Sequence, residues 1–444
     1  MEFLTDIILP AALLLTGIFL TVRLNFVQVR YLFTGLRNML SGEKADSHGI
    51  SPFASLMASL AAQLGTGNIV GAGSAIITGG PGAVFWMWVS AFFGMATAYS
   101  EASLSIITRR RLKNGEIQGG APCYIQKAFE GRGGKILSSL FSLFATVALG
   151  FTGVAVQSSS ISSAMNEAFG IPFFITGGLV TLAAAFFILR GTRAVTALAE
   201  KTVPLFGVLY VLFSVAVLIF NVRNLPLALR LIFTGAFSPE ALFGGITGIG
   251  IKEAVTQGVK RGLFTNEAGM GSSPAAHALS SSDNPHFQGT LGLAGVFIDT
   301  FLMLGITALG IITVLYTGDT APSALLSGSE AVTISMASLL GDKGASVFIA
   351  ISVLLFAFLS VLGWNLYGKA TAVFLFGEKS KGIYLISSLF FIFSGAVMPV
   401  RTVWLLTDIF NSLMVLTNVP ALIRLSGKTR EFLPRNIEKR QKQC

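Results

Sequence analysis

Apolar runs long enough to cross a bilayer follow one another along almost the whole chain. A hydrocarbon core takes roughly 20 helical residues, and eleven runs fit or approach that length. They cover residues 7–22, 53–78, 83–107, 136–164, 173–189, 203–220, 240–264, 289–316, 345–376, 383–399 and 403–423. Shorter helices are expected at residues 121–129 and 330–340. The pattern predicts an all-α polytopic membrane protein with a single transmembrane domain.

The second run is interrupted at its middle. Gly65 and Gly67 each cost on the order of 1 kcal/mol relative to alanine inside a helix, and Thr66 and Asn68 place polar groups at mid-membrane depth. Irregular backbone at that depth survives only where it is buried in protein or lines a wet cavity. A helix broken there exposes peptide groups of opposite polarity, which is how many secondary transporters hold a small zwitterion and a cation.

Helix packing is the alternative interpretation of these residues. Gly67 and Gly71 have the GxxxG spacing that lets membrane helices approach closely, and glycine is frequent in such helices generally. Packing does not require the carboxamide of Asn68, however, and that residue favours a binding site.

A second glycine-rich stretch, residues 244–250, falls in the seventh run. Five runs separate the starts of the two interrupted runs, and an odd number means that the second unit crosses the membrane in the opposite sense. Two inverted five-helix units, each with an interrupted first helix, are the arrangement expected around a midplane site. The predicted organisation is an extra N-terminal helix with its connector (1–50), two repeats (51–221 and 222–423) and a basic tail (424–444).

Charge predicts the orientation. A net charge of +10 would suggest nucleic acid in a soluble protein, but here the basic residues flank apolar runs, so no nucleic-acid partner is expected. With the N-terminus outside and the C-terminus cytoplasmic, 26 of the 31 Lys and Arg residues fall on the cytoplasmic side, as the positive-inside rule requires. Cys123 and Cys444 then lie in cytoplasmic segments, so we expect no disulfide. The expected location is the plasma membrane.

Further polar and aromatic residues lie inside the runs. Gln157 is central in the fourth run, where the alternative to a substrate contact is an interhelical hydrogen bond worth about 0.6–2 kcal/mol. Ser360 and Trp364 are one turn apart on one helix face, and Trp364 is too central for the interfacial belt, which favours a pocket wall. Asp299 must be paired or hydrated at its depth, and is a candidate for an ion path.

Four motifs resemble those of the alanine or glycine:cation symporter family. They are GTGNIVG at residues 65–71, GGPG at 79–82, KRGLFTNEAGMGS at 260–272 and LGWN at 362–365. The resemblance runs nearly end to end, and the NEAGMGS block is its most specific part. It implies a LeuT-type fold of ten core helices, a 5+5 inverted repeat with discontinuous first and sixth core helices, plus one extra N-terminal helix. It also implies uptake of alanine, glycine or a similar small neutral amino acid with Na⁺ as the coupling ion and no cofactor.

The resemblance implies roles for individual residues as well. The expected substrate-binding set is Thr66, Gly67, Asn68, Gln157, Gly248, Gly250, Ser360 and Trp364. The expected sodium ligands are the backbone carbonyls of Ala61 and Leu64 with the hydroxyl of Ser360. The chain departs from the family at Leu359, where a second hydroxyl is usual, and at Val154, where an asparagine often lies.

Rival functions stay open at this point. One is a symporter that is driven by protons through Asp299 or Glu101, or one that prefers a larger neutral amino acid such as glutamine. Another class is a passive channel or a non-transporting sensor. An enzyme is least expected, because the aqueous segments contain no catalytic triad, metal cluster or phosphate loop.

Overall fold

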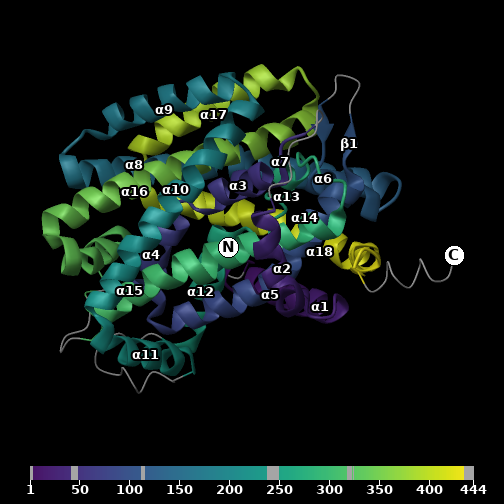
Figure 1. Ribbon diagram of the computed structural model, residues 1–444. Coiled ribbons are helices and arrows are strands. Elements are labelled where there is room, and N and C mark those ends of the chain that lie inside the picture. The colour runs from purple at the N-terminus through teal and green to yellow at the C-terminus, as the bar shows by residue number, and fades with distance from the viewer. Residues whose placement is uncertain are drawn as a thin grey trace.

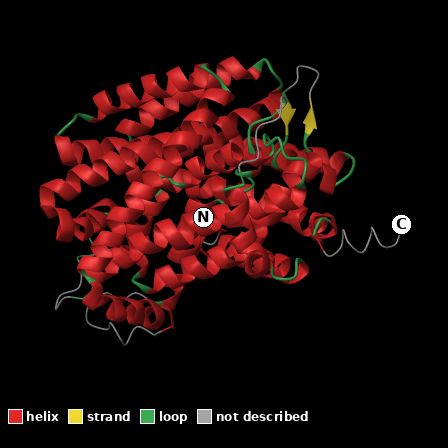
Figure 2. Cartoon of the chain, viewed as in Figure 1, coloured by secondary structure: helices red, strands yellow, loops and turns green. Residues whose placement is uncertain are grey.

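The computed structural model describes residues 4–41, 49–111, 116–237, 250–317, 323 and 325–434. Within these residues the chain is almost entirely helical (Figure 2). The exception is an antiparallel hairpin of β1 (Arg110–Arg111) and β2 (Ile117–Gln118), which stands at one edge of the helix assembly.

The elements of the first half alternate long membrane helices with short turns (Figure 1). They are η1 (Leu4–Ile8), α1 (Leu9–Arg23), α2 (Val27–Met39), α3 (Pro52–Gln63), η2 (Gly67–Gly71), α4 (Ala72–Gly79), α5 (Gly82–Thr108), α6 (Ala121–Ala128), α7 (Arg132–Val147), η3 (Ala148–Gly153), α8 (Val154–Phe169), α9 (Phe173–Leu189), α10 (Thr192–Phe220) and η4 (Val222–Asn224).

The second half returns through the same assembly. Its elements are α11 (Leu225–Phe237), α12 (Ile251–Asn266), α13 (Pro274–His277), α14 (Pro285–Val296), η6 (Phe297–Leu304), α15 (Gly305–Leu315), α16 (Gly328–Phe376), α17 (Ser380–Val397) and α18 (Val400–Glu431). α16 is kinked at Gly341, where φ is 68°. Helices distant in sequence pack together: α5 contacts both α12 and α14, and α9 lies beside α17 (Figure 1).

Eight helices of the described chain are long and apolar enough to cross a membrane singly. They are Thr5–Arg23, Gly82–Thr108, Arg132–Phe169, Thr192–Phe220, Pro285–Leu315, Gly328–Phe376, Ser380–Val397 and Thr402–Glu431. The α3–α4 pair adds a ninth if it is counted as one bent span. The remaining two of the eleven expected spans coincide with shorter helices, α9 and α12. The two shorter helices expected from the sequence are present as α6 and as the first part of α16.

The predicted interruption of the second run is present between α3 and α4. The Ser51 hydroxyl caps α3 by accepting from Ala54 N–H at 3.0 Å. The helix ends at Leu64, whose ψ of 57° turns the backbone out of the helical path. The chain then resumes through the π-helical turn η2, and the two helical halves meet at 50°. The whole segment from Ala54 to Ile69 is buried, which is the environment that broken backbone in a membrane requires.

A second interruption follows α12. Glu267, Gly269 and Gly271 all have positive φ, at 56°, 91° and 78°. This left-handed backbone is accessible to glycine at little cost but is unusual for glutamate. Only the short helix α13 follows before α14. The irregular segment lies within the NEAGMGS block.

The sequence placed this second break elsewhere. Residues 244–249, including Gly248, lie outside the described residues, and Gly250 is the residue at which α12 begins. α12 continues as unbroken helix from Ile251 to Asn266. The break described here therefore comes after α12, not before it.

With the N-terminus outside, counting charges along the chain placed Lys260 and Arg261 in a cytoplasmic segment at the end of the seventh run. The structure places them beside the first and last apolar helices, close to Asp6 and Asp408. Lys260 Nζ is 3.0 Å from Asp6 Oδ1, at the start of the first apolar helix. Arg23 marks the opposite end of that helix and lies near Gly427 in the C-terminal part of α18. Assigning Lys260 and Arg261 to the cytoplasmic end of the seventh run was therefore wrong, because α12 enters from the face where the first helix begins.

Candidate functional site

Three helices meet at the first break. The backbone N–H of Thr66 donates to Gln157 Oε1 of α8 at 3.1 Å. The Ser360 hydroxyl of α16 donates to the carbonyl oxygen of Ala61 at 2.8 Å. A side chain on Gly65 would have its Cβ 2.6 Å from Ser360 Oγ and 2.8 Å from Gln157 Nε2. The break thus brings backbone and side-chain polar groups together in a small buried space.

Some polar atoms at this break have no protein partner. Thr66 Oγ1 and Gln157 Nε2 are buried and make no hydrogen bond within the described residues. A buried polar group without a partner costs about 1–3 kcal/mol. The hydroxyl and the amide can both donate, so this is a place where a polar ligand would be stabilised.

Asn68 belongs to a second polar cluster beside the break. Its Nδ2 donates to Asp299 Oδ1 at 2.8 Å and to the Asp299 carbonyl at 3.1 Å. Its Oδ1 accepts a hydrogen bond from the hydroxyl of Thr265, and Thr265 Oγ1 also lies 3.2 Å from Asp299 Oδ1. All three residues are buried. η2, α12 and η6 are therefore joined by a compact set of oxygen atoms.

Trp364 of α16 contacts the second break. Its indole Nε1 donates to Glu267 Oε1 at 2.5 Å, and its ring packs edge-on against Phe264 at a centroid distance of 5.4 Å. Phe264 in turn lies 4.4 Å from the ring of Trp404. The Ser272 hydroxyl donates to the other carboxylate oxygen of Glu267 at 2.5 Å. This wall ties the second break to α16.

The structure brings together most of the residues expected at the site. Those at the first break or in direct contact with it or its neighbouring cluster are Ala61, Leu64, Thr66, Gly67, Asn68, Gln157, Ser360 and Asp299. Trp364 contacts the second break instead, through Glu267. Gly250 is not among them. It precedes Thr265 by 15 residues, about 22 Å of helix, so α12 holds it far from the break. Leu359 and Val154 are both buried.

Sequence reasoning missed Thr265 and Glu267 as site residues. Both lie in or beside the NEAGMGS block, which served only as a mark of resemblance. Thr265 is the closest neighbour of Gly67, whose added Cβ would lie 2.9 Å from Thr265 Oγ1. The sequence feature that could have indicated these two residues is a block rich in glycine and polar residues directly after an amphiphilic helix.

Residues 1–443 match the sodium:alanine symporter family. The chain belongs to this family. As a member it is a sodium-coupled amino-acid symporter of the membrane and not an enzyme. Its resemblance to the alanine or glycine:cation symporters is thereby confirmed.

Curated relatives agree with this membership. The sodium/alanine symporter AgcS of Methanococcus maripaludis is 38% identical over 94% of this chain and 91% of its own length. The probable sodium/glutamine symporter GlnT of Bacillus subtilis is 37% identical over 96% of this chain and 87% of its own.

The fold is also that of a solved transporter. The crystal structure of MhsT in complex with L-phenylalanine is similar to this chain with a TM-score of 0.54, at 15% identity, over 88% of this chain and 89% of that chain. The LeuT-type architecture expected from the sequence is confirmed.

Proposed function

We propose that this symporter carries a small neutral amino acid, alanine or glycine, into the cell together with Na⁺ by alternating access. The observation that carries the proposal is the first break, where Thr66 Oγ1 and Gln157 Nε2 are buried without protein partners. Two hydrogen-bond donors in a confined space suit a carboxylate. Ser360 and Gln157 crowd the backbone at Gly65, and a small amino acid is proposed for that reason.

The substrate carboxylate is proposed to bind at Thr66, Gly67 and Asn68, where the N-terminus of the helical stretch 67–79 begins. Helix N-termini favour anions, because their first N–H groups lack helical partners. Gln157 contacts the amino acid from α8, and Trp364 covers it from α16. The Asn68 side chain is hydrogen-bonded to Asp299 and Thr265. Its main role is therefore to hold η2 in position.

The coupling Na⁺ is proposed to bind the carbonyl oxygens of Ala61 and Leu64 and the Ser360 hydroxyl. Hard cations prefer oxygen ligands of this kind. Ser360 Oγ and Ala61 O already lie 2.8 Å apart, so one ion can bridge both. Leu359 provides no hydroxyl for a further ligand.

A proton is the alternative coupling ion. The observation that favours it is Asp299, which is buried and accepts hydrogen bonds from Asn68, Thr265 and Thr300. The same oxygen cluster could hold a second cation instead. In both cases Asp299 is a proposed part of the ion path.

The proposed orientation has the N-terminus outside and the C-terminus in the cytoplasm of a cell whose plasma membrane holds the protein. It is supported by basic residues from distant segments that the structure brings together, since Arg190, Arg193, Lys369 and Lys381 line one pocket. Substrate and Na⁺ then enter from the opposite face, and their shared contacts stabilise the closed state more than the open one. The two breaks supply the hinges.

Uptake into proteoliposomes tests the proposal. Labelled alanine, glycine and glutamine are offered under an inward Na⁺ gradient at equal pH, or under a pH gradient without Na⁺. Protein-free liposomes and ionophore-treated vesicles are the controls. The expected result is uphill accumulation of alanine and glycine, above glutamine, driven by Na⁺ alone. Accumulation driven by the pH gradient alone would establish proton coupling, and flux without accumulation would establish a channel.

A further inference from the structure

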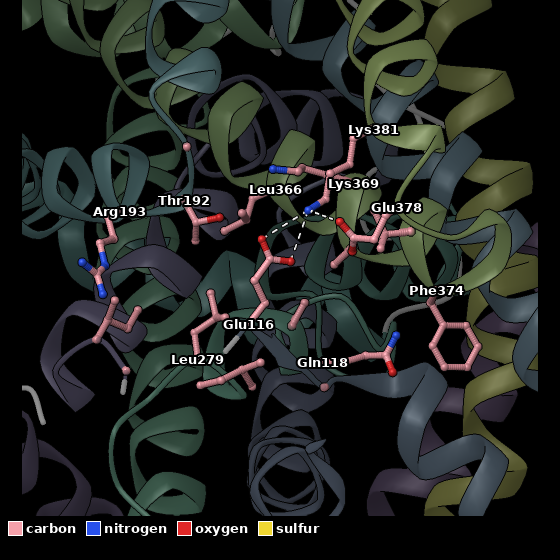
Figure 3. Close-up of a pocket in the computed structure, with 18 of the residues that line it drawn as sticks. Glu116, Gln118, Thr192, Arg193, Leu279, Leu366, Lys369, Phe374, Glu378 and Lys381 are labelled. Atoms are coloured by element: carbon pink, nitrogen blue, oxygen red, sulfur yellow. Dashed lines mark hydrogen bonds and ion pairs between the residues drawn. The ribbon is translucent and has the colours of Figure 1, made fainter. Parts of the chain in front are cut away.

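A pocket of about 560 Å³ lies on the basic side of the molecule (Figure 3). It is bounded by the β1–β2 hairpin, the start of α10, α13, α16 and α17. Part of its lining is apolar and includes Leu279, Leu366 and Val373. Another part is charged: the side chains of Glu116, Lys369, Glu378 and Lys381 converge at one end of the pocket (Figure 3).

The pocket shares its walls with the candidate transport site. α16 supplies Ser360 to the first break and Lys369 to the pocket, nine residues and about 14 Å farther along the helix. Ala275 lies in α13, directly after the second break, and also lines the pocket. The pocket and the candidate transport site therefore share two walls, α16 and the segment that contains α13.

The two lysines of the pocket differ in their partners. Lys381 Nζ lies 3.2 Å from both carboxylate oxygens of Glu116 and 2.5 Å from Glu378 Oε2. Lys369 is half-buried and makes no hydrogen bond or ion pair with any residue that the structure describes. A cationic side chain within a membrane helix is costly unless it is paired or hydrated. Lys369 thus carries a positive charge that Glu116 and Glu378 balance through space, without an ion pair.

We propose that this pocket is a second binding site for the transported amino acid. The Lys369 ammonium binds the α-carboxylate, Glu116 and Glu378 attract the α-ammonium, and the aliphatic side chain packs on Leu366 and Val373. The assignment rests on the proposed function for the identity of the ligand. A zwitterion matches a pocket that carries both signs of charge and an apolar wall. A simple anion would bind Lys369 but would be repelled by the carboxylates of Glu116 and Glu378.

The site contains no part of the proposed sodium set, so its occupancy does not require Na⁺. It therefore binds the amino acid weakly and independently of the coupling ion. The pocket receives the substrate after its release from the first break. It thereby makes rebinding of the substrate at the first break less frequent.

Cysteine labelling tests this site in the full-length protein. Thr192→Cys places a reporter in the pocket wall, in a background with Cys123→Ser and Cys444→Ser, and its rate of reaction with a polar methanethiosulfonate is measured without Na⁺. Alanine is expected to slow the reaction. Adding Lys369→Gln should raise the alanine concentration for half-protection about tenfold, the loss expected for one charge-assisted contact. The matched control Lys379→Gln, an exposed lysine outside the pocket, should leave it unchanged.

Three outcomes would overturn the proposal: no protection by alanine without Na⁺, protection that Lys369→Gln does not alter, or equal protection by propionate, which would show a general anion site. Sodium-driven uptake by the same reporter protein is measured in parallel. Loss of uptake with protection retained would refute the proposed function and not this site. Uptake retained without protection would refute only the site.

Discussion

Gly65 lies at a position of the first break where a larger side chain would displace its neighbours. Its φ and ψ do not lie in the left-handed region, so conformational freedom alone does not explain the glycine. The reason is contact: an added Cβ would lie 2.6 Å from Ser360 Oγ and 2.8 Å from Gln157 Nε2, distances at which an atom must move. Both neighbours are polar groups of the proposed substrate and sodium sites.

Gly65→Ala is therefore predicted to displace Ser360 or Gln157. The concentration of alanine for half-maximal sodium-driven uptake should rise at least about tenfold, equivalent to about 1.4 kcal/mol. Gly178→Ala is the matched control, because a Cβ there meets nothing within 4 Å. An unchanged half-saturating concentration in Gly65→Ala would show that the substrate does not use this space.

Among the elements, the second break depends on a carboxylate from a distant helix. Glu101 of α5 is fully buried and accepts hydrogen bonds from the backbone N–H groups of Gly269 and Gly271, at 3.1 and 2.9 Å. Asn418 of α18 adds a third donor at 2.7 Å and also donates to the Gly269 carbonyl. Together these bonds hold an irregular segment whose own backbone contributes a turn, in which Met270 N–H donates to the Glu267 carbonyl at 3.0 Å.

Glu101→Gln should loosen this segment. The amide presents an NH₂ group to donors that need an acceptor, so at least one buried donor loses its hydrogen bond, at a cost of about 1–3 kcal/mol. The predicted results are a lower melting temperature of the purified protein and impaired uptake. Glu253→Gln, at an exposed position of α12, is the control and should leave both unchanged. Equal melting temperatures for the two variants would refute the role of Glu101.

The docking of α13 makes stability depend on pH. His277 is buried, and burial lowers its pKa from 6.5 to about 4. Its Nδ1 pairs with Gln288 Nε2 at 2.7 Å. Because the folded state keeps this histidine neutral, stability is full above pH 6.5 and falls as the pH drops toward 4, by up to about 1.4 kcal/mol per pH unit.

His277→Gln should accordingly flatten the decline of the melting temperature between pH 6.5 and pH 4.5. The variant loses stability at neutral pH through poorer packing, so the comparison is made on the slope and not on the absolute value. A slope equal to that of the unmodified protein would contradict the assignment.

The elements also show what a sequence can and cannot reveal. The first break was predictable, because Gly65, Thr66 and Asn68 are poor helix formers in the middle of an apolar run. For the second, the sequence indicated residues 244–250, where glycines are most dense and of which the structure describes only Gly250; the break after α12 was not predicted. Its actual site depends on Glu101 and Asn418, which lie 168 and 149 residues from Gly269. Such long-range bonds leave no local pattern in the sequence.

On the scale of the whole molecule, apolar periodicity and charge were sufficient for the membrane class, and the motifs for the family. They were insufficient for placing Lys260 and Arg261, which counting charges along the chain put on the cytoplasmic side. The ion pair of Lys260 with Asp6 joins α12 to the N-terminal helix. Ion pairs between distant helices show on which side of the molecule a basic residue lies. Counting charges along the chain does not show this.

The account as a whole depends on the first break as the place where cargo is held. Asn68 fixes η2 to α12 and η6 through Thr265 and Asp299, so Asn68→Ala should disrupt that place without affecting insertion into the membrane. Asn166→Ala is the control, since Asn166 bonds only within its own helix end, to the Ile171 carbonyl.

The decisive measurement is sodium-driven accumulation of labelled alanine in proteoliposomes that contain equal amounts of the two variants, each eluting as folded protein. Asn166→Ala is predicted to accumulate alanine against its gradient, and Asn68→Ala is predicted to accumulate none. Normal accumulation by Asn68→Ala would contradict the account.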